Sequence, residues 1–326
     1  PNLSVYLVIS PSRYIQGKGT LAEITKYTER LGKKLLILVS KSGKKRVEEK
    51  INKAVEGTDT TVVWEIFNGE CSKSEVNRIG ENLKKEKCDV VVGIGGGKIL
   101  DTAKAVAYYE DIAVVCVPTA ASTDAPCSAL SVLYTDDGQF DEYLWLPANP
   151  DIILLDTDII VAAPVRLIVS GMGDALATYF ETRACMRSNT TSCMGGSVSK
   201  TAMALSELCF KTLMEDGAKA LLAVNAGACT PAVENIIEAN TYLSGIGFES
   251  GGIAAAHAIH NGLTCIEETH GMYHGEKVAF GVLSQLVLEN VSTEDLEEVV
   301  EFCLAVGLPV CLEDIGVDTI TDEELM

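Results

Sequence analysis

The first half of the chain alternates short apolar runs with amphipathic stretches, and this alternation restricts the possible fold more than any other feature. The apolar runs are typical of buried strands, and the stretches between them have the period of surface helices. Strands that alternate with helices form a parallel, doubly wound sheet. We predict strands over Ser4–Ile9, Lys34–Val39, Thr61–Phe67, Asp89–Ile94, Ala113–Val117 and Ile152–Leu155, helices over Thr20–Leu31, Ser42–Val55, Ser74–Lys87 and Lys98–Tyr109, and a β-hairpin over Ser131–Leu146 around Asp137-Gly138.

From Pro164 onward helical periodicity dominates. We therefore place a domain boundary near Ala162–Pro164, with an α/β domain over 1–163 and a helical domain over 164–326. Ligands of an open α/β sheet bind at the carboxyl ends of its strands, so we expect the site in the cleft between the domains. The predicted helices are Arg166–Arg183, Ser197–Glu215, Ala218–Ala226, Ala232–Gly247, Gly252–Cys265, Lys277–Asn290 and Asp295–Val306.

The chain ends shortly after a possible helix start. Thr321 and Glu324 form a capping box for a helix that has barely begun at Met326, so we expect the native chain to continue and the helical domain to be truncated here.

Composition limits the partners and the compartment. The net charge of −20 makes nucleic acid and anionic membranes poor partners, because both require a basic surface. No apolar run reaches the roughly 18–20 residues of a membrane span, and the N-terminal stretch PNLSVYLVISPSRY lacks the basic region and cleavage site of a signal peptide. The eleven cysteines are scattered without CxxC pairs, which suits reduced thiols in a cytoplasmic protein.

All four histidines of the chain fall within 18 residues. His257 and His260 are three residues apart and His270 and His274 are four apart, so each pair can share one helix face. Neutral imidazoles are common ligands of zinc and similar metals, and a metal site needs several such donors together. A metal centre is our leading interpretation. The alternative for any one of them is a hydrogen-bonded core histidine.

A glycine cluster follows a predicted buried strand. Val90–Lys104 reads VVVGIGGGKILDTAK, which matches neither the Walker A pattern nor GxGxxG. Consecutive glycines before a helix still allow backbone amides to approach a phosphate, so we predict a pyrophosphate site there. The alternative is a tight turn between strand and helix.

Two further polar features remain ambiguous on their own. The loop Val117–Leu130 places Thr119, Ser122, Asp124 and Ser128 after a strand, where a doubly wound fold has nicotinamide or substrate contacts, but an ordinary polar turn explains it equally well. Asp174 is a carboxylate near the start of an apolar helix, and it is either functional or a helix-start residue.

Five segments carry a resemblance over nearly the whole chain: GIGGGKILDTAKA (93–105), VPTAASTDAPCSALSVLY (117–134), SGMGDALATYFE (170–181), ANTYLSGIGFESGGIAAAHAIHNGLT (239–264) and HGMYHGEKVAFG (270–281). By these segments the chain is identified as a member of the metal-dependent, or iron-containing, alcohol dehydrogenase superfamily. The resemblance implies a Rossmann-like N-terminal domain and an all-helical C-terminal domain of the dehydroquinate synthase-like kind. It also implies a cytoplasmic homo-oligomer, with octamers frequent among relatives.

The resemblance also implies roles for individual residues. Asp174, His257 and His274 are the implied metal ligands, and His257, His274 and Asp124 the implied catalytic residues, with Asp124 at the substrate. The implied nucleotide contacts are Gly95, Gly96, Gly97, Lys98, Asp101, Thr119, Ser122, Ser128, Leu130 and Tyr134. The implied reaction is the oxidation of glycerol to dihydroxyacetone, with the ionised, metal-bound alcohol as hydride donor and NAD as acceptor.

Two positions depart from the pattern of relatives. Iron-type members carry a further His four residues after the Asp, and this chain has Thr178 there. Three protein ligands and an open position suit catalytic zinc, which leaves His260 and His270 around the ligands. Relatives have an acidic residue after the second strand, whereas this chain has Ser40 and Lys41, which weakens discrimination against NADP. NAD remains the expected cofactor.

Two alternative functions stay open. Glycerol-1-phosphate dehydrogenase and dehydroquinate synthase are superfamily members whose substrates would need a basic pocket. The loops beside the candidate ligands offer only Lys277 as an obvious cation, so these enzymes rank second. The other alternative is a protein that binds nucleotide or metal without catalysis.

Overall fold

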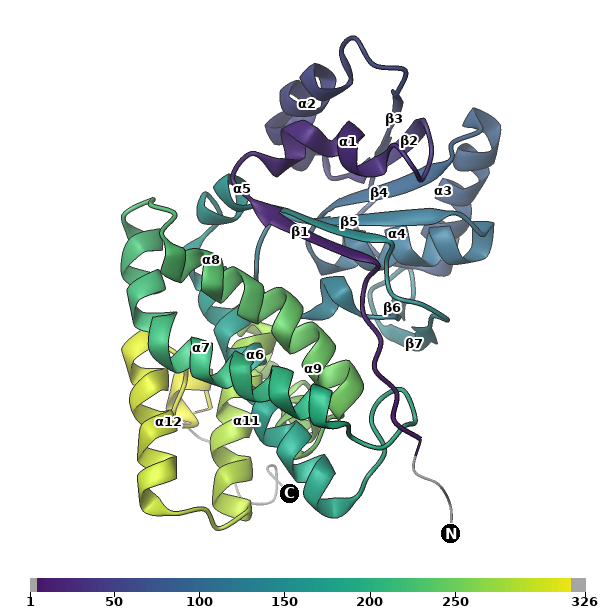
Figure 1. Ribbon diagram of the computed structural model, residues 1–326. Helices are drawn as coiled ribbons and strands as arrows, with labels where there is room; N and C mark the ends of the chain where they lie inside the picture. The colour runs from purple at the N-terminus through teal and green to yellow at the C-terminus, as the bar shows by residue number, and fades with distance from the viewer. Residues whose placement is uncertain (1–4, 318–326) are drawn as a thin grey trace. The chain divides into compact units, whose positions relative to one another are not determined.

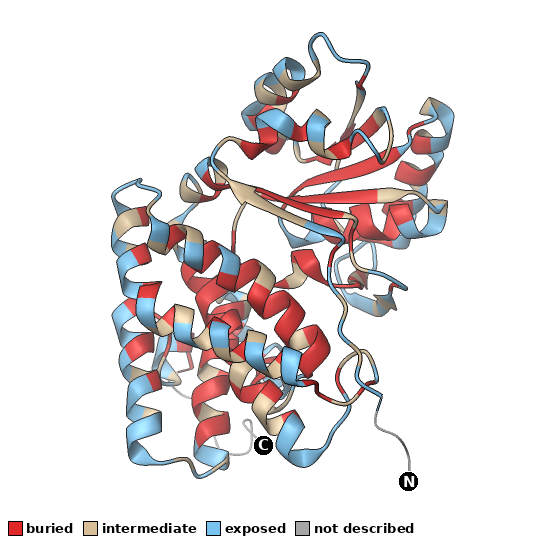
Figure 2. Cartoon of the chain, viewed as in Figure 1, coloured by how far each residue is buried: buried red, intermediate tan, exposed pale blue. Residues whose placement is uncertain are grey.

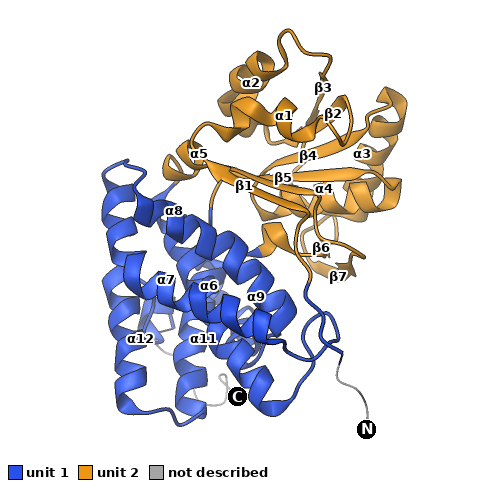
Figure 3. Cartoon of the chain, viewed as in Figure 1, with its two compact units in different colours: residues 1–8, 121–124, 164–326 blue, residues 9–120, 125–163 orange. Residues whose placement is uncertain are grey.

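The computed structural model describes residues 5–317, and they form two compact units (Figures 1 and 3). The first unit, here the helical unit, comprises residues 1–8, 121–124 and 164–326. The second, here the α/β unit, comprises residues 9–120 and 125–163. Four residues of the polar loop, Ala121–Asp124, thus belong to the helical unit although the residues before and after them belong to the α/β unit. The predicted capping box at Thr321 and Glu324 lies outside the described residues.

The α/β unit contains the predicted parallel sheet. Its six strands lie in the order β1-β8-β5-β4-β2-β3, and every pairing is parallel. The chain order of the strands reverses between β2 and β4, which is where a doubly wound fold binds nucleotides. The strands are β1 (Arg13–Gly17), β2 (Lys34–Val39), β3 (Thr61–Ile66), β4 (Val90–Gly95), β5 (Ala113–Pro118) and β8 (Ile152–Asp156).

The prediction of the first strand was wrong. The edge strand is Arg13–Gly17, which pairs with β8 from Arg13↔Ile152 to Gly17↔Asp156. In the predicted segment Ser4–Ile9, Ser4 lies outside the described residues, and Val5, Tyr6 and Val8 are exposed. Tyr6 forms only an isolated bridge, with Ser197 of the helical unit. High β-propensity misled the prediction, because an edge strand is defined by its partner rather than by its own residues.

Alternate residues of the central strands form one core with the helices on one face of the sheet. Leu35, Ile37 and Val39 of β2 pack in this core with Val47 and Ile51 of helix α2 (Lys41–Val55), and all five are essentially inaccessible. Complete burial of such a side chain contributes roughly 1.5–3 kcal/mol. The 3₁₀ turn Thr20–Glu23 and helix α1 (Ile24–Thr28) add to this core, and Figure 2 shows the buried central strands.

Two further helices and a hairpin complete the α/β unit. Helix α4 (Gly97–Glu110) packs on β4 and β5, and helix α3 (Lys73–Glu86) packs on α4. The predicted hairpin is present as β6 (Leu130–Tyr134) and β7 (Phe140–Trp145), which are antiparallel, with Gly138 at a φ of 85° in the connection. The short 3₁₀ turn Ala125–Cys127 precedes the hairpin, and helix α5 (Thr157–Val161) ends the unit.

In the helical unit, α6 (Val165–Ser188) is largely buried, whereas several of the helices around it have one exposed side (Figure 2). The elements of this unit are α6 (Val165–Ser188), α7 (Lys200–Asn225), α8 (Pro231–Glu238), a π-helical turn (Ala239–Leu243), α9 (Ser244–Gly251), α10 (Ala255–Leu263), the 3₁₀ turns Glu267–Gly271 and Glu313–Ile315, α11 (His274–Leu288) and α12 (Thr293–Val306). None of the helices within residues 5–317 is long and apolar enough to cross a membrane.

Two helix boundaries in this unit differ from the prediction. The predicted break near Gly217 does not occur, and α7 runs through it. A Cβ at Gly217 would lie 2.7 Å from the ring of Phe302, so this glycine makes room for α12 rather than ending a helix. The predicted helix Ala232–Gly247 instead passes through the π-helical turn and continues to Gly251 as α9.

Candidate metal centre and nucleotide-binding loop

Three donors from three helices converge in the helical unit. Asp174 comes from α6, His257 from α10 and His274 from the first residue of α11, and one ligand atom of each lies within 4.8 Å of the others. Asp174 Oδ1 is 3.1 Å from His274 Nε2 and 3.6 Å from His257 Nε2. One carboxylate oxygen and two imidazole nitrogens are a donor set that catalytic zinc uses, so these residues fit the implied metal.

Glycines bring two of these donors together. A Cβ on Gly275 would lie 1.7 Å from the carbonyl oxygen of Ser170, and a Cβ on Gly173 would lie 2.3 Å from the carbonyl oxygen of Gly275. The backbones of α6 and α11 therefore touch at a distance that only glycine permits. Because Asp174 follows Gly173 and His274 precedes Gly275, this contact sets the separation of the two donors.

The third donor, His257, is held by a buried carboxylate. Glu181 Oε2 is 2.6 Å from His257 Nδ1, and Glu181 Oε1 accepts hydrogen bonds from the backbone amides of Ala254 (2.8 Å) and His257 (2.9 Å). The Glu181 side chain is fully buried. Glu181 was not among the residues predicted for the site. The signal that could have identified it is its position seven residues after Asp174, two turns along the same helix.

The charges of the cluster shift the pKa of Asp174 and the pKa of His257. Burial opposes ionisation of Asp174, but His274 and His257 outweigh it and hold the pKa of that carboxyl well below its usual range. Burial lowers the pKa of His257, but Glu181 and Asp174 outweigh it and raise that pKa well above its usual value. Protons and a metal ion would compete for the same Nε2 atoms, so metal affinity should fall as the pH falls.

Asp124 lies beside this cluster and belongs to the same unit. Its backbone amide donates to Asp174 Oδ2 (3.1 Å), and its buried carboxyl accepts a hydrogen bond from Ser244 Oγ (2.6 Å). Ser244 Oγ also contacts Thr178 Oγ1 (2.8 Å), so the side chain four residues after Asp174 is held by a hydrogen bond within the helical unit. Burial, followed by the negative charge of Asp174, raises the pKa of Asp124 well above its usual value.

The other two histidines have different surroundings. The His260 ring lies 4.3 Å from the His274 ring, edge to face, and burial followed by the charge of His274 lowers the pKa of His260 to about 3. His270 is exposed, and its Nε2 lies 3.0 Å from the carbonyl oxygen of Thr264. Neither belongs to the cluster of three donors.

In the α/β unit, the glycine loop divides into packed and open positions. Cβ atoms on Gly93 and Gly95 would lie 2.7 Å and 2.6 Å from Ala103 and Ile99 of α4, so these glycines allow the helix to pack on its strand. A Cβ on Gly96 or Gly97 would meet no atom of the described chain within 4 Å. Nothing in the protein's own packing requires glycine at these two positions, so the first turn of α4 is left open to a ligand, and the residues fit a pyrophosphate.

Lys98 and Asp101 both make contacts within the α/β unit. Lys98 Nζ is 2.6 Å from Glu70 and 5.3 Å from the ring centre of Tyr134, whose pKa is raised by burial. Asp101 pairs with the fully buried Lys104 (2.9 Å) and accepts a hydrogen bond from the amide of Val132 (3.1 Å). Asp101 therefore holds the first strand of the hairpin in place. Lys104 was not among the residues predicted for the site.

The remaining predicted contacts lie at strand ends and loops. The amide of Thr119 donates to the carbonyl oxygen of Gly95 (3.1 Å), which joins the ends of β4 and β5. Ser128 Oγ donates to the carbonyl oxygen of Ala125 (2.9 Å), and Leu130 begins β6. Ser122 belongs to the helical unit, where its carbonyl oxygen accepts from Ser170 Oγ (3.5 Å). The roles of these residues stay predictions.

The residue after the second strand has a structural task. Ser40 is the N-cap of α2, and its Oγ accepts a hydrogen bond from the amide of Gly43 (3.0 Å). Lys44 lies over the Trp64 ring at 5.2 Å and pairs with Glu48 at 3.2 Å. Ser40 thus caps the start of α2.

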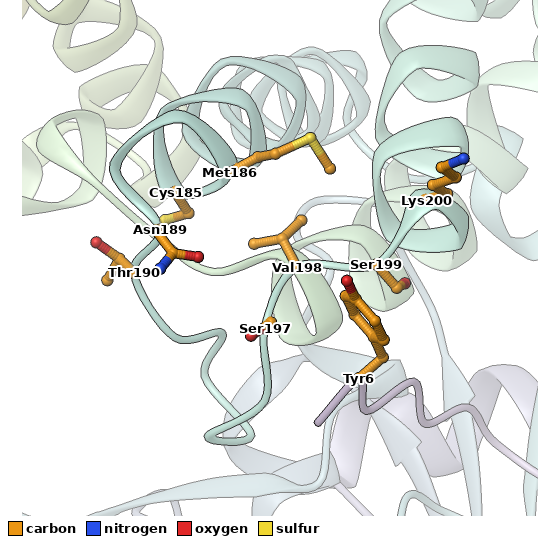
Figure 4. Close-up of a pocket in the computed structure, with 9 residues that line it drawn as sticks. All are labelled: Tyr6, Cys185, Met186, Asn189, Thr190, Ser197, Val198, Ser199 and Lys200. Carbon is orange, nitrogen blue, oxygen red and sulfur yellow. The ribbon is translucent and has the colours of Figure 1, made fainter. Parts of the chain in front are cut away.

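A pocket of about 580 Å³ lies elsewhere in the helical unit (Figure 4). Tyr6 comes from the N-terminal segment, Cys185 and Met186 from the end of α6, and the other lining residues from the loop before α7 and its first turn: Asn189, Thr190, Ser197, Val198, Ser199 and Lys200. None of these residues is one of the three converging donors.

Comparison with known proteins places this chain in a family. A model of the iron-containing alcohol dehydrogenase family matches residues 11–157. A relative from Citrobacter freundii is 51% identical over 320 residues, which are 98% of this chain and 88% of the relative. The chain belongs to the iron-containing alcohol dehydrogenase family.

Within this family the similarity is to one kind of enzyme. The Citrobacter freundii relative is named glycerol dehydrogenase, as is a Thermotoga maritima protein that is 52% identical over 318 residues, 98% of this chain and 87% of that relative. The crystal structure of glycerol dehydrogenase from Schizosaccharomyces pombe has a TM-score of 0.94 and 41% identity, and the match covers 99% of this chain and 82% of that chain.

Proposed function

We propose that the protein is a zinc-dependent glycerol dehydrogenase that uses NAD. The observation that carries the proposal is the convergence of Asp174, His257 and His274 in a chain about half identical to proteins named glycerol dehydrogenase. In the proposed reaction glycerol loses a hydride from C2 to the nicotinamide ring and a proton from its C2 hydroxyl. The products are dihydroxyacetone, NADH and a proton.

Each part of the site has a proposed task. Asp174, His257 and His274 would hold the metal, which when bound supplies the Lewis acidity that lowers the pKa of a substrate hydroxyl. The Asp124 carboxyl, fixed by Ser244 and beside Asp174, would accept a hydrogen bond from a hydroxyl of glycerol and orient that hydroxyl. Asp124 is proposed to contact the substrate because it lies next to the three proposed ligands without being one of them.

The glycine loop would hold the nucleotide. The open positions Gly96 and Gly97 would admit the pyrophosphate to the first turn of α4, where helix amides favour negative charge. Lys98 would turn from Glu70 toward the phosphates. Thr119, Ser128, Leu130 and Tyr134, at the ends of β5 and β6 and in the loop between them, would lie on the nicotinamide side.

A comparison of two substrates tests the proposed function. Initial rates would be measured with glycerol and with sn-glycerol 1-phosphate, each with NAD and with NADP, on zinc-loaded protein. We expect kcat/KM to be highest for glycerol with NAD. Arg166 near the ligands is already paired with Glu276 through two contacts of 2.5 and 2.8 Å, which argues against its use for a substrate phosphate. A higher kcat/KM for the phosphorylated substrate would overturn the assignment.

A further inference from the structure

Glu181 makes more contacts than a charge partner of a histidine requires. Its side chain projects from α6 and is fully buried, and both of its carboxylate oxygens have hydrogen-bond partners. Oε2 faces the ring nitrogen Nδ1 of His257 at 2.6 Å, and Oε1 accepts from the amides of Ala254 and His257. One carboxylate thus holds both the backbone and the side chain of the same residue.

The ring contact selects one form of the imidazole. A carboxylate oxygen can only accept, so the short Nδ1 contact requires the hydrogen to sit on Nδ1 of His257. In the neutral ring the lone pair then lies on Nε2. Nε2 is the atom that faces Asp174 Oδ1 at 3.6 Å, on the side of the cluster shared with His274. Glu181 therefore directs the only free lone pair of this ring into the donor cluster.

The backbone contacts fix where the ring can be. Helix α10 begins at Ala255, and the amides at its start are capped by side chains rather than by a preceding turn. Glu181 accepts hydrogen bonds from the amides of Ala254 and His257, and Gln285 of α11 accepts one from the amide of Ala256 at 3.0 Å. Asp174 and Glu181 project from the same helix two turns apart, so α6 carries groups that hold both nitrogens of His257.

We propose that Glu181 is the positioning residue of the metal centre: it keeps His257 in its Nδ1–H form and aims Nε2 at an ion shared with Asp174 and His274. This inference rests on the proposed metal site, but it assigns a task to a residue outside the ligand set. The carboxylate does not touch the ion or the substrate in this account.

The test is Glu181→Gln, which preserves the shape of the side chain but no longer favours the Nδ1–H form of His257. The glutamine oxygen can still accept from the two backbone amides, but its NH₂ group then faces His257 Nδ1. To accept from that NH₂ group the imidazole must move its hydrogen to Nε2, which can no longer bind a metal ion. We expect zinc affinity, measured by competition with a chromophoric chelator, to fall about 10–100-fold. Nitrogen-15 NMR of histidine-labelled, metal-free protein should show the His257 Nδ1–H signal in the wild type and its loss in the variant.

Two further variants separate the orientation of the His257 ring from the stability of the protein and from the charge at position 181. Gln285→Leu removes another cap of α10 but leaves the imidazole contact, so it should lower the unfolding midpoint and leave zinc affinity near that of the wild type. Glu181→Asp keeps the charge but withdraws the carboxylate by one methylene, so it should lose zinc affinity as Glu181→Gln does.

Three results would overturn the inference. They are wild-type zinc affinity in Glu181→Gln, wild-type affinity in Glu181→Asp, and an equal loss of affinity in Gln285→Leu. Failure of the wild-type protein itself to bind zinc would instead refute the proposed metal site, so the two failures are distinguishable.

Discussion

The buried ion pair of the α/β unit offers a quantitative test of how the hairpin is held. The Lys104 side chain is fully buried, and its Nζ lies 2.9 Å from Asp101 Oδ1, 3.2 Å from the carbonyl oxygen of Ala125, and in contact with the carbonyl oxygen of Leu130. Lys104→Met keeps the length of the side chain and removes the charge. The Asp101 carboxylate, only 12% exposed, would then remain without its cation.

Removal of one partner of a buried ion pair costs about 3–5 kcal/mol, because the other charge stays buried and uncompensated. We expect this loss in the free energy of unfolding of Lys104→Met. In the double variant Lys104→Met/Asp101→Asn, the uncompensated charge is also removed, and the asparagine keeps an acceptor for the amide of Val132. The double variant should therefore lose about 1–3 kcal/mol less unfolding free energy than the sum of the losses in the two single variants.

The assay is urea unfolding followed by tryptophan fluorescence. Both tryptophans of the chain, Trp64 and Trp145, lie in the α/β unit, so their emission reports on this unit. Strict additivity of the two substitutions, or a loss below about 1 kcal/mol in Lys104→Met, would refute the reasoning, since the pair would then contribute no more than a surface salt bridge.

Three further predictions follow from the structure. Gly275→Ala should push α11 away from α6 and weaken zinc binding, whereas Gly262→Ala, whose Cβ meets no described atom within 4 Å, should raise the unfolding midpoint or leave it unchanged; calorimetry and chelator competition compare the two. Burial of Glu75 opposes its ionisation, but hydrogen bonds from Arg78 and Asn68 lower its pKa, so its stabilisation should be present above about pH 4.5 and lost as the pH falls through the lowered pKa. Glu75→Gln should flatten this acid dependence of unfolding, and an unchanged dependence would contradict the assignment. His257→Ala should abolish bound zinc and activity together while the tryptophan emission stays native, and full activity in that variant would refute its role as a ligand.

Most of the α/β elements could be predicted because their signals are local. The strand Lys34–Val39 is a continuous apolar run and was predicted with the bounds that the structure has. The first strand could not be found in this way, because Arg13–Gly17 is only partly buried and is a strand through its hydrogen bonds to β8. Gly217 misled the prediction for a similar reason: its neighbour Phe302 is 85 residues further along the chain.

The site shows the same division between local and distant signals. The clustering of the four histidines pointed to a metal centre, and the structure brings one histidine of each predicted pair, His257 and His274, together with Asp174. Glu181 and Lys104 were missed because a charged residue within a helical pattern predicts a solvated face, and only the packing around each shows that it is buried. The predicted reduced thiols are consistent with the structure, in which the eleven cysteines, all among the described residues, form no disulfide, and burial raises the pKa of Cys116 to about 12.

The most direct test of the account is glycerol-dependent reduction of NAD, followed by the near-ultraviolet absorbance of NADH, in untreated protein, after removal of metal with a chelator, and after zinc is restored. We expect activity in the first sample, its loss in the second and its recovery in the third. Activity that is indifferent to complete removal of metal would show that Asp174, His257 and His274 do not hold a catalytic ion.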